Sequence, residues 1–333
     1  MRWSVFGVRG VAVAAATVAG LVVAMQPAGA VGGNGVGDGV TYMRPFNAAH
    51  QDAHGKPGGG GGGTNNLLYR GGVNDNGSLV GVEVPQTNSH ATVYLVLWGQ
   101  QWPGNDPSGE AGILQSFYSG VGGSSWLNSV AQYCQGIASS SSTCPTNAAF
   151  ADGNIQFGNV WADTSVVAPS RASQSQIAAE AVRAANHFGA TPSMLLNSQF
   201  VIASPKGFDP SGFGTQYCAW HSSVSTTAGY LAYTNLPYMT DGGASCGAGF
   251  NGLSQTAGIT IVGGHEMAES ITDQFPNGGW LDGQGEENGD KCAWISGSST
   301  TPAASKNVTF LNGSSFPVQS LWSNAAGGCV TSS

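Results

Sequence analysis

Charged side chains are scarce in this chain of 333 residues. Only 8% of the residues are charged, and 10 Lys and Arg residues stand against 18 Asp and Glu residues. An acidic surface that is poor in basic side chains does not attract nucleic acids or anionic membranes. We therefore expect neither partner, and we expect neutral polar residues to keep a monomeric chain in solution.

Long apolar runs are absent after the first 30 residues. At the start, Arg2 and Arg9 precede an apolar run over Val11–Met25, and Ala28-Gly29-Ala30 supplies the small residues that a signal peptidase needs. The run is too short and wrongly flanked for a membrane span. The pattern predicts a signal peptide at residues 1–30 and a secreted, extracellular protein.

Large apolar residues are also rare in residues 31–66, where glycine dominates and the run Gly58–Gly63 occurs. A segment of this composition cannot bury a core. We therefore expect residues 31–66 to be a flexible linker or a propeptide. The folded part is expected to begin near Leu67 and to form a single α/β domain over residues 67–333.

The cysteines are few but even in number, and all six follow the predicted signal peptide. In an oxidising compartment, such a set predicts three disulfides. None of the spacings is that of a zinc finger, so structural disulfides are expected. We predict sequential pairing, because each pair then brackets a plausible loop: Cys134–Cys144, Cys218–Cys246 and Cys292–Cys329.

Strand and helix patterns alternate after Leu67. The β-branched and aromatic run Ala91–Trp98 is typical of a central strand covered on both faces. Ser173–Phe188 is the clearest helix, since Ser173 and Gln176 form a capping box and Gly189 follows. The other expected elements are strands at 67–72, 79–84, 154–161, 199–203 and 230–236, helices at 112–121, 124–133 and 254–273, and a hairpin at 308–318. This order predicts a mixed sheet with flanking helices, followed by a loop-rich, disulfide-braced C-terminal part.

The last of these helices carries a His-Glu motif, in which Glu266 follows His265 and Glu269 lies four residues after the His. Residues four apart share one face of a helix, so His265 and Glu269 can bind one metal ion beside Glu266 as a general base. The familiar form of this motif has a second His in place of Glu269. A solvated helix face is the alternative, but acids are scarce here and Gly263-Gly264 precedes the motif, which allows close packing of the helix.

Two ligands on one helical turn leave a catalytic zinc ion short of its usual three. Glu287 and Asp290 are the preferred further ligands, because a glycine-rich loop can return them to the helix and Cys292 can anchor that loop. Asp273 lies about 12 Å beyond His265 along an ideal helix, so it can join only if the helix ends first. We expect it to be a supporting or loop residue.

The identity of the metal depends on the donors. Zn²⁺ suits a site that contains His265, whereas a set rich in carboxylates also suits Ca²⁺, which seldom takes imidazole. His221 is expected in a loop between two strands near the helix. There it is a candidate to bind the metal, to polarise a scissile carbonyl or to stabilise an oxyanion, with a hydrogen-bonded structural His as the alternative.

Several short motifs resemble known proteins. The late motifs resemble those of a group of secreted bacterial proteins, and the earlier ones resemble, more distantly, the plant EXORDIUM or phosphate-induced protein 1 family. The late motifs are His265–Asp273, Glu287–Cys292, Trp322–Asn324 and Cys329–Val330, and the earlier ones are Leu68–Gly72, Tyr94–Gly99 and Cys218–His221. The plant resemblance implies an extracellular protein associated with growth and the cell wall, without a catalytic mechanism.

Two hypotheses follow from these residues. In the first, the chain is a secreted zincin-like metal-dependent hydrolase, most simply a zinc peptidase acting on a peptide or protein substrate, because the late helix and irregular tail resemble the arrangement of zinc-dependent peptidases. In the second, it is a non-catalytic extracellular protein of EXORDIUM type that binds cell-wall glycan or another carbohydrate.

Overall fold

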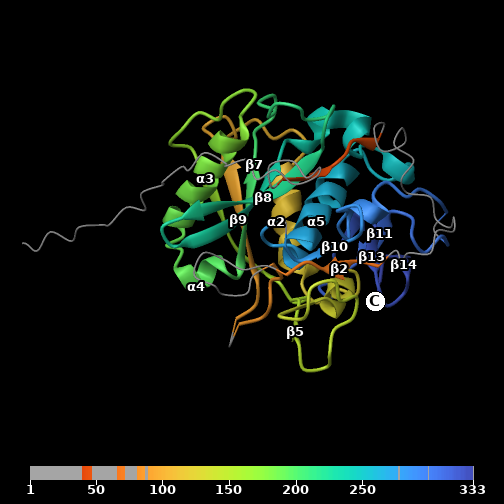
Figure 1. Ribbon diagram of the computed structural model, residues 1–333. Helices are drawn as coiled ribbons and strands as arrows, with labels where there is room; N and C mark the ends of the chain where they lie inside the picture. Colours follow the sequence, from red (N-terminus) through yellow and green to blue (C-terminus); the bar gives the residue numbers. More distant parts are fainter. Residues whose placement is uncertain are drawn as a thin grey trace, which may run out of the picture.

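A six-stranded mixed sheet forms the centre of the fold in the computed structural model, which describes residues 40–46, 66–71, 81–86, 89–276, 278–298 and 300–332. The strand order is β1-β8-β9-β7-β3-β6 (Figure 1). Strands β6, β3, β7 and β9 are parallel, whereas β8 runs antiparallel to β9 and β1 runs antiparallel to β8. The strands are β1 (Thr41–Met43), β3 (Thr92–Trp98), β6 (Gln156–Asp163), β7 (Ser198–Ala203), β8 (Ala219–Thr226) and β9 (Gly229–Leu236).

The apolar run at Ala91–Trp98 forms β3 in the interior of this sheet, as predicted. Its side chains alternate between two separate cores: Val93 and Leu95 belong to one, and Val96 and Trp98 belong to the other. Because successive side chains of a strand point to opposite faces, a strand covered on both sides needs apolar residues at nearly every position.

Helices cover both faces of the sheet. On one face, α2 (Glu110–Val121) packs against α5 (Ala257–Thr272), and α5 also contacts β8, β9 and β1. On the other face, α3 (Gln174–His187) and α4 (Pro192–Leu195) lie against β7 and β9 (Figure 1). The predicted capping box of α3 is confirmed, since Ser173 and Gln176 bond one another reciprocally. The mixed α/β architecture with flanking helices therefore agrees with the prediction.

Close packing of α5 depends on its glycines. A Cβ atom on Gly263 would lie 3.2 Å from the Tyr118 hydroxyl, and one on Gly264 would lie 3.0 Å from the Trp126 ring. These aromatic rings come from α2 and from the turn before the 3-10 helix η1 (Leu127–Gln132). As a result, every residue of α5 is buried.

Short elements and disulfides build the C-terminal part. The predicted hairpin is formed by β11 (Lys306–Thr309) and β12 (Ser315–Val318). All three predicted disulfides, Cys134–Cys144, Cys218–Cys246 and Cys292–Cys329, are present. The remaining elements are β2 (Leu68–Tyr69), β4 (Cys134–Gln135), β5 (Ala149–Phe150), η2 (Met239–Cys246), η3 (Phe250–Gly252), β10 (Trp280–Leu281), η4 (Asp290–Cys292), β13 (Leu321–Ser323) and β14 (Gly328–Val330).

Three expectations about local structure differ from the fold. The strand expected at 67–72 is reduced to β2, and the described part of 79–84 contains no strand. Residues 31–66 are not entirely a linker, because Val40–Phe46 joins the fold as β1 with Val40 and Met43 buried. The run Val40–Met43 has β-branched and aromatic residues that suit a strand, but it is short and the glycine-rich residues around it concealed it. The predicted signal peptide lies outside the described residues.

No helix in the described part of the chain is both long enough and apolar enough to cross a membrane.

Candidate metal centre

The buried helix α5 presents the His-Glu motif to β8 and to the loop before η4. His265 and Glu269 lie on one face, with 3.0 Å between His265 Nε2 and Glu269 Oε1. His265, Glu266 and Glu269 are all fully buried. The alternative of a solvated helix face is therefore wrong, and the carboxylates lie where an unpaired charge is costly.

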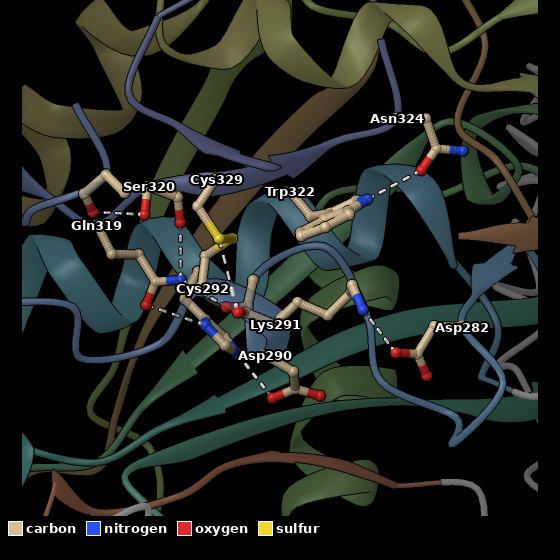
Figure 2. Close-up of a disulfide and its surroundings, with 12 residues drawn as sticks. Asp282, Asp290, Lys291, Cys292, Gln319, Ser320, Trp322, Asn324 and Cys329 are labelled. Atoms are coloured by element: carbon tan, nitrogen blue, oxygen red, sulfur yellow. Dashed lines mark hydrogen bonds and ion pairs between the residues drawn. A yellow bond between two sulfur atoms is a disulfide. The ribbon is translucent and has the colours of Figure 1, made fainter. Parts of the chain in front are cut away.

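Asp290, the first residue of η4, reaches the helix at the end of the loop that follows β10. Its Oδ1 lies 3.6 Å from His265 Nε2, and its backbone N–H donates to Glu269 Oε1 at 2.9 Å. Figure 2 shows this loop held by the Cys292–Cys329 disulfide and by the ion pair between Lys291 and Asp282. The predicted return of the loop to the helix, with Cys292 as its anchor, is confirmed.

Gly289 allows the loop to pass directly against the motif. A Cβ atom at this position would lie 2.7 Å from His265 Nδ1 and 2.8 Å from Glu269 Oε1. Any side chain would therefore displace the imidazole or the carboxylate. This steric restriction explains why the motif Glu287-Asn288-Gly289-Asp290 has a glycine at its third position.

Gln319, between β12 and β13, determines which nitrogen of His265 is available. Its amide Nε2 donates to the carbonyl oxygens of Gly289 and Ser320, at 2.8 and 3.1 Å. Its Oε1 must therefore face His265 Nδ1, which lies 3.2 Å away, and it accepts that hydrogen. The Nε2 lone pair is then left pointing at the two carboxylates, as a metal-ligating imidazole requires.

His221 lies on β8 and not in a loop, contrary to the prediction. It stands opposite Thr41 of β1 and Thr234 of β9 in the sheet. Its Nε2 is 3.0 Å from Glu287 Oε2 and 3.8 Å from Glu269 Oε2. Strand β8 therefore brings the His221 imidazole to α5. The sequence Gln216–Ser222 did not show that a strand begins there.

The donors form two overlapping groups that share Glu269. One group is His265, Glu269 and Asp290, and the other is His221, Glu266 and Glu269; within each group the ligand atoms lie within 4.8 Å of one another. Two donors that each lie about 2 Å from one ion are at most about 4 Å apart. The separations of His265 Nε2 from Glu269 Oε1 and from Asp290 Oδ1, 3.0 and 3.6 Å, meet this condition. Glu287 instead bonds to His221, and Asp273 caps the end of α5 one turn beyond Glu269.

Burial controls the electrostatics of these carboxyls. It raises the pKa of Glu266, Glu269 and Asp290 well above the usual range, and the neighbouring carboxylates raise each further. The backbone of Met43 partly opposes the effect at Glu266. Burial lowers the pKa of His265, which favours its neutral form. The ion-pair partners of Glu269 and Asp290 among the described residues are histidines, so a bound cation would compensate the ionised carboxylates.

Several buried polar atoms of the site have no hydrogen-bond partner among the described residues. They include both carboxylate oxygens of Glu266, Oε2 of Glu269, Oε1 of Glu287 and Nδ1 of His221. Buried polar atoms normally have partners, and an ion or a substrate group would supply them. Together with the imidazole and carboxylate donors, these atoms fit a divalent metal ion.

Sequence reasoning missed two residues of the site. Gln319 had no local signal, because it lies 54 positions from His265 in the chain. Asn288 donates through its Nδ2 to the Ala268 carbonyl at 3.1 Å and the Thr272 hydroxyl at 2.6 Å. Asn288 holds the loop against α5. Its place next to Glu287 in the motif Glu287–Cys292 was the feature of the sequence that could have indicated it.

A serine nucleophile lacks the required context. Gly243-Ala244-Ser245-Cys246-Gly247 has Gly-x-Ser-x-Gly spacing, but most of it lies in the 3-10 helix η2. A nucleophile elbow needs a sharp turn from a strand into a helix. Cys246 is instead joined to Cys218, so this segment braces the start of β8.

In comparisons with known proteins, no family model, no curated protein and no solved structure matches the chain. The function is therefore argued from the side chains that α5, β8 and the loop before η4 bring together.

Proposed function

We propose that this chain is a secreted, zincin-like metal-dependent hydrolase, most simply a zinc peptidase. His265, Glu269 and Asp290 would hold the ion, and Asp290 is preferred over Glu287 and Asp273 as the third ligand. The observation that carries the proposal is the convergence of these three donors from a buried helix and a disulfide-anchored loop. The three disulfides are compatible with an extracellular location.

Zinc is the preferred ion because its donors here include an imidazole whose tautomer Gln319 sets. Calcium is the alternative, since the other donors are carboxylate oxygens and Ca²⁺ prefers oxygen ligands. A bound Zn²⁺ ion supplies Lewis acidity, which lowers the pKa of water and polarises a carbonyl group.

Glu266 is proposed as the general base. It is fully buried beside Glu269, and neither of its carboxylate oxygens has a hydrogen-bond partner in the described part of the chain. A carboxylate whose pKa is raised by burial accepts a proton from water more readily than an exposed one. His221, supported by Glu287, is proposed to stabilise the negative charge that develops on a substrate oxygen.

The test compares metal content and peptide hydrolysis in the full-length wild type and in Glu266→Gln. The variant is expected to keep the metal and to lose about 10²- to 10⁴-fold in turnover. Glu269→Gln is expected to lose the metal as well. Glu83→Gln is a matched control, because Glu83 is also fully buried but belongs to neither donor group. A folded wild type that takes up neither zinc nor calcium refutes the proposal.

The complete burial of His221, His265, Glu266 and Glu269 favours a second candidate function. A closed site suits a structural ion in a non-catalytic extracellular protein that binds cell-wall carbohydrate. In that case, metal removal lowers the melting temperature, but no peptide is hydrolysed and Glu266→Gln changes only stability. Binding to insoluble cell-wall glycan would then be the positive result.

A further inference from the structure

The candidate metal centre is closed to large molecules. His221, His265, Glu266 and Glu269 are buried, and the Asp290 side chain retains only 13% exposure. A polymer chain cannot reach Glu266 through so small an opening. Some part of the surface must therefore leave before the proposed hydrolase can act.

Strand β1 is the part that lies against the centre from the edge of the sheet. Thr41 is paired with His221 across the strands, and the backbone of Met43 is near enough to Glu266 to lower its pKa. β1 also contacts α5, and Met43 has no exposed surface. Figure 1 shows β1 as the red strand beyond β8.

Backbone hydrogen bonds and aromatic contacts hold this segment. The Met43 carbonyl accepts from the Cys218 N–H at 2.8 Å, and the Arg44 carbonyl accepts from Trp294 Nε1 at 2.7 Å. Phe46 adds edge contacts to the rings of Phe250 and Trp294. The paired region spans three residues on a single neighbouring strand.

The other elements around the centre are tied more firmly. Cys218–Cys246 anchors the residue before β8, and Cys292–Cys329 anchors the loop that carries Asp290. Helix α5 is buried along its whole length. β1 is therefore the element that can leave without breaking a disulfide. Its departure takes Met43 out of the core to which α5 contributes, and a peptide bound in its place would refill that position.

We propose that the edge of β8 beside α5 is a binding site for an extended polypeptide, and that Val40–Phe46 occupies it within this chain. The inference rests on the proposed function, whose substrate class it names. An exposed strand edge binds an extended peptide through main-chain hydrogen bonds, and pockets for alternate side chains add selectivity. A peptide in place of β1 would pass His221 and Glu266 with its main chain.

The side chains of Val40–Phe46 indicate which peptides fit. Met43 is buried in the core to which α5 contributes, so the equivalent position favours a long apolar side chain.

The test uses the full chain and a fluorescein-labelled synthetic peptide with the sequence of Val40–Phe46. Phe46→Ala and the double variant Met43→Ser/Phe46→Ser weaken the resident strand without altering either donor group. Fluorescence anisotropy is expected to show that the peptide binds both variants at least about tenfold more tightly than the wild type, in which the resident strand competes. A scrambled peptide, and one with Asp in place of Met, are expected to bind at least tenfold more weakly.

Hydrolysis, measured in parallel, separates this inference from the proposed function. Peptide binding with faster hydrolysis by the variants supports both. Peptide binding without any hydrolysis supports the binding site and removes the hydrolase. If the variants keep a cooperative melting transition and do not bind the peptide, the inference fails, even if the wild type hydrolyses other peptides.

Hydrogen exchange on the wild type covers the case in which neither variant folds. The backbone amides of β1 are expected to exchange through local opening, faster than those of the interior strand β7. Equal protection of β1 and β7 would mean that β1 leaves only on global unfolding, and this would overturn the inference.

Discussion

Gln319→Leu tests whether the His265 tautomer controls metal binding at the candidate metal centre. The substitution keeps a side chain of similar size but removes the acceptor that faces His265 Nδ1 at 3.2 Å. It also removes the donors to the carbonyls of Gly289 and Ser320. The imidazole then has no partner that holds its hydrogen on Nδ1. The hydrogen can move to Nε2, which then has no lone pair for a metal ion.

The expected effect is on affinity as well as stability. Loss of a residue that orients a ligating imidazole weakens metal binding by about 10- to 100-fold, or about 1.4–2.7 kcal/mol. The Ser320 carbonyl loses the Gln319 donor, which destabilises the fold by about 1–3 kcal/mol, whereas the Gly289 carbonyl keeps the Cys292 N–H as a donor at 2.9 Å. Zinc affinity is measured by competition with a chromophoric chelator, and stability by thermal unfolding of the metal-free protein.

Two further variants separate orientation from packing. Gln319→Glu keeps an acceptor for the Nδ1 hydrogen and is expected to retain the wild-type affinity, although it loses the donors to Gly289 and Ser320. Gln199→Leu removes another buried amide, which donates to Glu83 Oε2 at 2.8 Å outside the donor groups. It is expected to lower stability alone. Equal zinc affinities in wild type and Gln319→Leu would refute the assigned tautomer.

Three other changes probe the loop and the buried acids. Gly289→Ala would place a Cβ atom 2.7 Å from the His265 imidazole, so it is expected to abolish metal uptake and to destabilise the folded protein by about 1–3 kcal/mol. Gly283→Ala is the control, because the space around its Cβ atom is open, and it is expected to leave the metal content unchanged. Removing the Cys292–Cys329 disulfide, which closes a separation of 37 residues, should lower the free energy of unfolding by about 4 kcal/mol and weaken metal binding. Removing Cys134–Cys144, which closes a separation of 10 residues, should lower the free energy of unfolding by about 3 kcal/mol and leave metal binding unchanged. Burial raises the pKa of Glu83 from 4.5 to about 8, so the folded state binds the extra proton and the metal-free protein should lose stability as the pH rises from 5 to 8. Melting temperatures in chelator over this range should fall less steeply in Glu83→Gln, and an unchanged slope would contradict the assignment.

Features that depend on neighbouring residues could be predicted well. The continuous apolar run at 92–98 indicated a strand covered on both faces, and the Ser173–Gln176 pair indicated the start of α3. The spacing of His265 and Glu269 placed them on one face of a helix, where they lie 3.0 Å apart. In each case the interaction joins residues a few positions apart, so a local pattern carries it.

Contacts between distant segments were predicted poorly. The strand β1 falls within the predicted linker, because a run of three residues among glycines does not show that it pairs with the distant β8. His221, expected in a loop, lies on β8, which pairs with β1 across the same distance in sequence. The choice between Glu287 and Asp290 also stayed open, since they lie only three positions apart and only the path of the loop brings Asp290 to His265 and Glu287 to His221.

The sequence by itself determined the chemical inventory: an imidazole and two carboxylates on one helical turn, further acids in a late glycine-rich segment, and cysteines whose sequential pairing closes short loops. Only the tertiary structure decided that the helix is buried on every side, that Gln319 orients His265, and that β1 covers the centre. The physical reason is that burial and hydrogen-bond partners belong to the whole packed chain, whereas helical spacing belongs to a single turn.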